Sequence, residues 1–108
     1  MDIKNTPIPA RRALKKLGQD LQEARKRRHL PMQLVAQRAA ISRITLSKIE
    51  RGNETVSIGA YARVLFVLGL VEKIANIADP SSDKLGLTLD AENLPKRIRI
   101  PKKEKRSA

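Results

Sequence analysis

Cysteine and tryptophan are absent from the chain, and histidine, tyrosine and phenylalanine occur once each. Without cysteine there is no disulfide, no thiolate zinc site and no cysteine nucleophile. His29 alone offers no imidazole cluster for a metal, and no glycine-rich loop of the kind that cradles phosphates is visible. We therefore expect a protein that is not an enzyme, with no catalytic residue, no metal site and no cofactor.

Long hydrophobic runs are also missing. The longest uninterrupted run covers eight residues, from Val64 to Val71, whereas a membrane-spanning helix needs about 20. The first residues, MDIKNTPIPARR, lack the apolar segment of a signal peptide. We therefore expect a cytoplasmic protein without a membrane-spanning segment.

Acidic residues are scarce at both ends of the chain, whose net charge is +12. Residues 1–30 and residues 96–108 each carry a net charge of +6, and residues 31–95 are neutral. Basic ends of this kind keep a small protein in solution, or bind a polyanion with release of its counterions. Because Tyr61 and Phe66 are the only aromatic residues, stacking on unpaired bases is poorly provided for, and we favour duplex nucleic acid over single strands.

The apolar spacing and the turn residues predict an all-α fold. Leu14, Leu17, Leu21 and Ala24 recur at helical spacing. Pro31 ends the first helix, Ser42 is a good N-cap for the third, and Gly52 is suited to a left-handed helix end. The expected helices cover residues 9–28, 32–39, 42–51, 58–68 and 71–78.

The chain is expected to divide into a loose arm, residues 1–8, a helical domain, residues 9–79, and a C-terminal segment, residues 80–108. Residues 81–89 are expected to form a linker in which Leu85, Leu87 and Leu89 alternate. Lys96–Ile100 (KRIRI) carries a short β-strand signal. Such a strand would pair with residues 85–89 or with a second subunit. Residues 102–108 are expected to be disordered.

The fourth and fifth helices have more apolar residues than one face can use. Five of them suffice for the core: Ile58, Tyr61, Ala62, Leu65 and Leu68. Four more are expected outside it, as a dimer interface: Phe66, Leu70, Ile74 and Ile77. The alternative is that the C-terminal segment covers these four residues.

Residues 17–70 carry a family resemblance. LGQDLQEARKRRHL resembles the first helix of the Cro/CI-type (XRE-family, lambda-repressor-like) helix-turn-helix domain, and ISRITLSKIERG resembles its recognition helix and the following loop. This resemblance implies a five-helix domain that places its third helix in the DNA major groove. Pro31, Met32 and Ala40 depart from the usual Thr, Gln and Gly. Met32 removes a side chain that commonly braces a phosphate, and Ala40 is tolerable only if its backbone is not strongly left-handed.

The resemblance also implies roles for individual residues. The positions that reach base edges are Arg43, Ile44, Ser47 and Lys48, whose chemistry suits guanine acceptors and the thymine methyl group. The positions that face phosphates are Ser42, Thr45, Arg51 and Asn53. Arg25 and Glu50 match a structural ion pair between the first and third helices. The alternative for the exposed positions is an ordinary solvated helix face.

The second half of the chain, VSIGAYARVLFVLGLVEKIANIADPSSDKLGLTLD followed by LPKRIR, resembles HipB-type antitoxins, which accompany HipA-like kinase toxins. This resemblance implies a prokaryotic, nucleoid-associated homodimer. It would repress its own operon at an inverted-repeat operator and hold a kinase toxin inactive. Two alternatives stay open within DNA binding, a stand-alone phage-type repressor and a restriction-modification controller. A basic protein that binds RNA or a membrane surface is the alternative from another class.

Overall fold

The computed structural model describes residues 5–97, and all regular structure within this range is helical. The elements are α1 (Ile8–Arg27), α2 (Met32–Arg38), α3 (Arg43–Glu50), α4 (Ile58–Val67), α5 (Glu72–Ala75), the 3₁₀ turn η2 (Pro80–Ser82) and α6 (Lys84–Arg97). The expectation of an all-α fold is confirmed. The chain forms two compact units, Met1–Ile74 and Ala75–Ala108.

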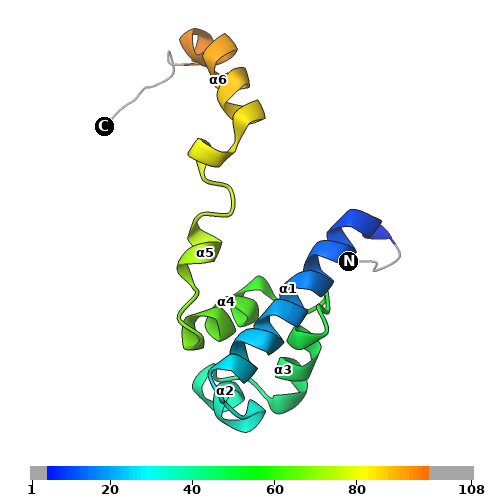
Figure 1. Ribbon diagram of the computed structural model, residues 1–108. Coiled ribbons are helices and arrows are strands. Elements are labelled where there is room, and N and C mark those ends of the chain that lie inside the picture. Colours follow the sequence, from blue (N-terminus) through cyan, green and yellow to red (C-terminus); the bar gives the residue numbers. More distant parts are fainter. Residues whose placement is uncertain (1–4, 98–108) are drawn as a thin grey trace. The chain divides into compact units, whose positions relative to one another are not determined.

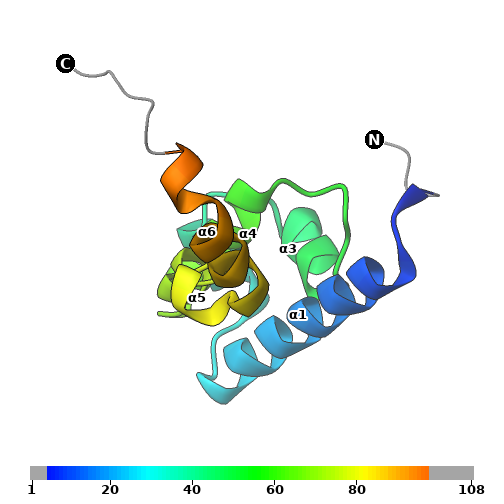
Figure 2. The same cartoon turned by 90° about the horizontal axis from the view of Figure 1, so that it is seen from above.

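The first unit is built around one hydrophobic core. Its most deeply buried large side chains are Val35, Leu46, Ile49 and Val64, contributed by α2, α3 and α4. Leu21 and Ala24 add the inner face of α1. Helix α1 runs alongside α3 in both views (Figures 1 and 2), and α2 packs against α3 and α4. The core therefore holds α3 between two neighbours.

Ile58 does not belong to this core, although the sequence pattern places it there. Its side chain is 72 % exposed. The buried face of α4 consists of Ala60, Tyr61, Val64 and Leu65, followed by the C-cap Leu68. Positions two apart on a helix do not share a face, so Ile58 lies away from the stripe that begins at Ala60.

Each of the helices α1 to α4 ends with a left-handed residue and the paired backbone bonds of a Schellman motif. The left-handed residues are His29, Ala40, Gly52 and Gly69. After α2, for example, the Ala40 N–H donates to the Gln37 carbonyl and the Ile41 N–H to the Ala36 carbonyl. Ala40 has φ +57°, so the condition under which alanine was expected to be tolerable is not met. The two backbone bonds hold the strained residue in place.

Helix α1 and the end of α3 approach each other through two glycines. A Cβ at Gly18 would lie 2.5 Å from the Ile49 carbonyl oxygen, and a Cβ at Gly52 would lie 2.5 Å from the Leu14 carbonyl oxygen. Both clashes are with backbone atoms, which cannot move aside as a flexible side chain can. The two glycines therefore fix how closely α1 lies on the end of α3.

The expected fifth helix, residues 71–78, is only the single turn Glu72–Ala75. The N–H groups of Lys73 and Ile74 donate to carbonyls three residues back, a tighter spacing that seldom continues. The expected helix is therefore too long.

The second unit contradicts the expected linker. Residues 84–97 form α6, and the Asp83 carboxylate accepts a hydrogen bond from the Gly86 N–H as its cap. The alternating leucines were taken as a strand signal, but leucine is among the better helix formers. Lys96 and Arg97 of the expected strand end α6, and residues 98–100 lie outside the described residues, as do residues 102–108. Within residues 5–97 no helix combines the length and apolarity needed to cross a bilayer.

Candidate nucleic-acid interface

Helix α3 carries most of the residues that the sequence singles out. Ser42 caps its N-terminus, where the Ser42 hydroxyl oxygen accepts a 3.0 Å hydrogen bond from the Thr45 N–H. Leu46 and Ile49 are fully buried and tie one face of α3 to the core. The opposite face is open: Arg43 and Lys48 are exposed, and Ile44 is 70 % exposed. An exposed isoleucine between two cations is a surface suited to contact rather than to solvation alone.

The hydroxyl groups of this helix are held in place by local hydrogen bonds. The Ser42 hydroxyl donates to the Thr45 hydroxyl oxygen at 2.9 Å. One turn further on, the Arg51 guanidinium donates to the Ser47 hydroxyl oxygen at 2.6 Å. Thr45 and Ser47 accept in these bonds, so each hydroxyl proton remains to be donated elsewhere. Arg51 joins Ser47 in a polar row that begins at Arg43.

Asn53 is turned into the loop after α3. Its side-chain oxygen accepts from the Thr55 N–H at 2.7 Å and from the Thr55 hydroxyl at 2.6 Å. Its backbone carbonyl accepts a 2.7 Å bond from the Tyr61 hydroxyl. Burial raises the pKa of Tyr61 above its ordinary value. Asn53 thus fastens the loop to α4, and its role as a phosphate-facing residue rests on the resemblance alone.

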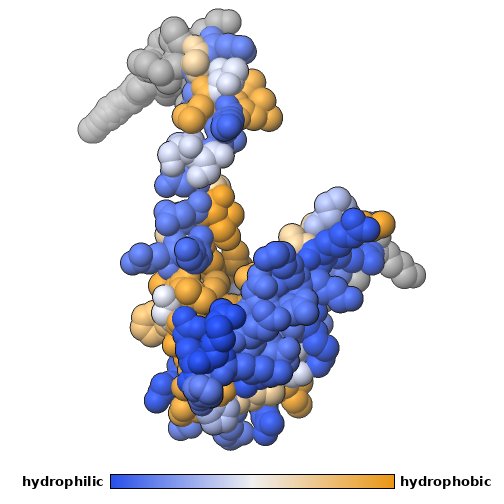
Figure 3. Space-filling view, viewed as in Figure 1, coloured by the Kyte–Doolittle hydropathy of each residue, from blue (hydrophilic) through white to orange (hydrophobic). Residues whose placement is uncertain are grey.

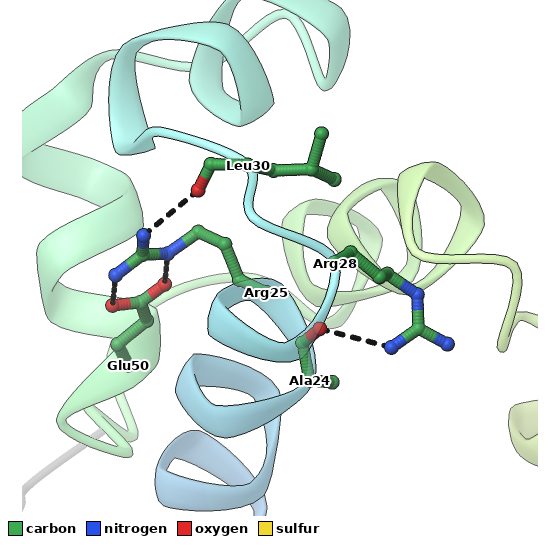
Figure 4. Close-up of polar contacts among 5 residues, drawn as sticks. All are labelled: Ala24, Arg25, Arg28, Leu30 and Glu50. Atoms are coloured by element: carbon green, nitrogen blue, oxygen red, sulfur yellow. Dashed lines mark hydrogen bonds and ion pairs between the residues drawn. The ribbon is translucent and has the colours of Figure 1, made fainter.

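Arg25 and Glu50 form the ion pair that the resemblance implies, and both residues are buried (Figure 4). The Arg25 Nε lies 2.7 Å from one carboxylate oxygen of Glu50, and a second guanidinium nitrogen lies 3.2 Å from the other. The third nitrogen donates to the Leu30 carbonyl at 3.0 Å. A paired, hydrogen-bonded charge can be buried without a large penalty. Arg25 therefore joins α1, the end of α3 and the segment that leads to α2.

A wide groove lies between α1 and the end of α3, and most of the residues that line it had no expected role. Its volume is about 890 Å³, and its lining includes Arg12, Lys15, Lys16, Gln19, Gln22, Glu50, Arg51 and Asn53. A smaller groove of about 290 Å³ shares Arg12, Lys15 and Arg51 with it. The signal that could have found this site is the spacing of the α1 residues, which puts cations and amides on one stripe.

One cation of the groove is paired within its own helix. Lys16 lies 2.6 Å from the Asp20 carboxylate, and this hydrogen bond raises the pKa of the Lys16 ammonium. The carboxylate of Glu50 is occupied by Arg25. No acidic residue of the lining therefore offsets the charges of Arg12, Lys15 and Arg51.

The four residues expected to form a dimer interface do not behave alike. Phe66 is 70 % exposed on α4, whereas Leu70 and Ile74 are partly buried and pack against the core. Ile77 is exposed but belongs to the second unit. The expectation that all four lie outside the core is wrong for Leu70 and Ile74, because α5 is too short to carry them away from it.

Comparison of the chain with protein-family models, with curated proteins and with solved structures finds no match. Among the described residues, no three His, Asp or Glu side chains are grouped so that they could hold a metal ion. The site is thus defined by its own geometry: a short helix with an exposed, cationic face, and a basic groove at the end of that helix.

Proposed function

We propose that this protein is a sequence-specific transcriptional repressor that binds duplex DNA through α3. The observation that carries the proposal is the division of α3 into a buried face, Leu46 and Ile49, and an open face with Arg43, Ile44 and Lys48. A short helix held rigidly in this way can enter the major groove with its outer face against the bases.

The side chains of the open face suit base edges. Arg43 and Lys48 are donors for the guanine O6 and N7 acceptors, and Ile44 is an apolar partner for a thymine methyl group. Ser42 and Thr45 lie at the N-terminus of α3, where hydroxyl and backbone N–H groups contact phosphates and set the register without reading sequence. The proposal therefore separates residues that select a sequence from residues that position the helix.

The proposal includes a homodimer, because one short helix reads few bases. Phe66, exposed on α4, supports a self-association surface. A two-fold dimer would present two α3 helices about 34–36 Å apart to an inverted repeat. The resemblance to HipB-type antitoxins extends the proposal to a partner, a HipA-like kinase toxin that the protein would hold inactive while it represses their common operon.

In vitro selection from a random duplex library, with the purified full-length chain, tests the DNA-binding proposal. We expect enrichment of an inverted repeat, and sedimentation of the complex as two chains per duplex. A failure to enrich any sequence would contradict the proposed function. The antitoxin part is tested separately, by co-purification from the native operon: recovery of a kinase-like protein supports it, and recovery of the protein alone contradicts it.

A further inference from the structure

Helix α1 is longer than the segment that carries the family resemblance. The resemblance begins at Leu17, whereas α1 begins at Ile8. The additional nine residues extend the helix by about 13 Å. They contain Arg11, Arg12, Lys15 and Lys16 and no acidic residue. A two-turn extension with this charge has no evident part in the hydrophobic core.

The extension is nevertheless held firmly against the end of α3. The backbone of Leu14 and Lys15 lies so close to Gly52 that a Cβ there would come within 2.6 Å of it. The N-terminal half of α1 lies beside the loop from α3 to α4 in both ribbon views (Figures 1 and 2). The groove between them is therefore preformed.

The groove has the chemistry of a phosphate-binding surface. Arg12, Lys15, Gln19 and Gln22 follow one another along α1 at spacings of three and four residues and line the groove with N–H donors. The face that α1 presents in Figure 3 is continuously hydrophilic, while hydrophobic surface gathers over α4. Guanidinium and ammonium groups bind phosphate oxygens by charge-assisted hydrogen bonds, to which neutral amides add further donors.

The groove is continuous with the open face of α3. Arg51 lines it and also donates to the Ser47 hydroxyl. Arg43, Ser47 and Arg51 are four residues apart in turn and form one row along the helix surface. A strand of DNA that follows this row past the end of α3 arrives at Arg12 and Lys15.

We propose that this basic groove between α1 and the end of α3 binds the DNA backbone outside the bases that α3 reads. This inference rests on the proposed function, because α3 must first place the duplex. It assigns to Arg12 and Lys15 phosphate contacts that add affinity without adding sequence preference.

The double variant Arg12→Ala/Lys15→Ala tests the groove, with Arg27→Ala/Lys73→Ala as its control. The control removes the same charge from a different groove of about 310 Å³, which also contains Asp20 and Glu23. Affinity is measured by fluorescence anisotropy against salt, on the duplex enriched by in vitro selection and on a scrambled duplex. Thermal melting verifies that all variants fold.

The expected result is a shallower dependence of log K on log salt for the groove variant. Each lost phosphate contact reduces the slope by about 0.9, so two contacts reduce it by about 1.8. The ratio of affinities for the selected and scrambled duplexes should stay within about twofold of the wild-type ratio, and the control should keep the wild-type slope. A groove variant with an unchanged slope would overturn the inference.

Truncation of the duplex provides the second measurement. Removing the base pairs that flank the selected repeat should weaken wild-type binding and leave the groove variant nearly unaffected, because its flanking contacts are already lost. Equal weakening of both proteins would overturn the inference while leaving base reading by α3 intact. If the wild-type chain shows no preference for the selected duplex, the proposed function fails instead, so the two failures are distinguishable.

Discussion

Ala40 occupies a backbone conformation that usually belongs to glycine. It has φ +57° at the end of α2 and an exposed side chain. A left-handed conformation costs an alanine about 1–2 kcal/mol. Two Schellman hydrogen bonds hold it there, from Ala40 to Gln37 and from Ile41 to Ala36. The turn between α2 and α3 is thus strained by its sequence.

Ala40→Gly should therefore stabilise the protein. The relief of about 1–2 kcal/mol, less about 0.4–1 kcal/mol for the greater freedom of glycine in the unfolded chain, leaves a gain of roughly 0.5–1 kcal/mol. The neighbouring Ala39→Gly should destabilise, because Ala39 is buried and right-handed. Urea unfolding of both variants measures the two signs. A less stable Ala40→Gly protein would show that the strain is absent.

Arg25 and Glu50 are coupled closely enough that reversing one charge should be severe. Glu50→Arg should lower the free energy of unfolding by about 3–5 kcal/mol, because it leaves two buried cations together. The exchange Arg25→Glu/Glu50→Arg should recover only part of this loss, since a glutamate at 25 cannot donate to the Leu30 carbonyl. Asp20→Lys, in the exposed pair with Lys16, is the control and should change stability little. A neutral Glu50→Arg would refute the pairing.

Tyr61 makes stability depend on alkaline pH. Its pKa is raised above the ordinary value of 10.0 because its phenol is buried, so the folded state favours the protonated form. This contribution is fully present below pH 10 and is lost as the pH rises through the raised pKa. The chain has one tyrosine, so ultraviolet absorbance reports its ionisation alone.

Tyr61→Phe should cost about 1 kcal/mol at neutral pH through the lost bond to the Asn53 carbonyl. Above pH 10 its stability should fall less steeply than that of the wild type. Chemical unfolding across this range measures both effects. Parallel curves for the two proteins would mean that Tyr61 ionises as easily in the folded state as in the unfolded state.

At the scale of the elements, the crossing of α1 and α3 depends on Gly52 more than on Gly69, although both are left-handed. Alanine at either position costs about 1–2 kcal/mol for its backbone. At Gly69 nothing lies within 4 Å of an added Cβ, whereas at Gly52 the backbone of α1 does. Gly52→Ala should therefore lose about 1–3 kcal/mol more. Equal thermal shifts of the two variants would place α1 further from α3 than described.

Most of the element boundaries near α3 follow from local chemistry that the sequence displays. Ser42 as a cap and Gly52 as a helix end are signals that depend on single residue types. The groove did not follow from the sequence, because it needs the distance between α1 and Arg51, which only the packing of Gly18 and Gly52 determines. Helix α6 was missed because its spaced leucines fit a strand pattern as well as a helix.

At the scale of the whole molecule, the charge distribution separates two tasks. Residues 31–95, which include α3, are neutral, while residues 1–30 carry a net charge of +6. A neutral reading unit selects bases, and the electrostatic attraction then comes from the basic extension of α1 and from the charged end of the sequence. Under this proposal, sequence preference and salt dependence are carried by different residues and can be changed independently.

The most direct test of the central claim is the base preference of Arg43→Ala, compared with Arg38→Ala on α2 as a control for lost charge. Affinities for the selected duplex, for its single-base-pair variants and for a scrambled duplex are measured at one salt concentration. The proposal predicts that Arg43→Ala loses about 1–3 kcal/mol of preference at one base pair and keeps its affinity for scrambled DNA. Equal weakening on selected and scrambled duplexes would contradict base reading by α3.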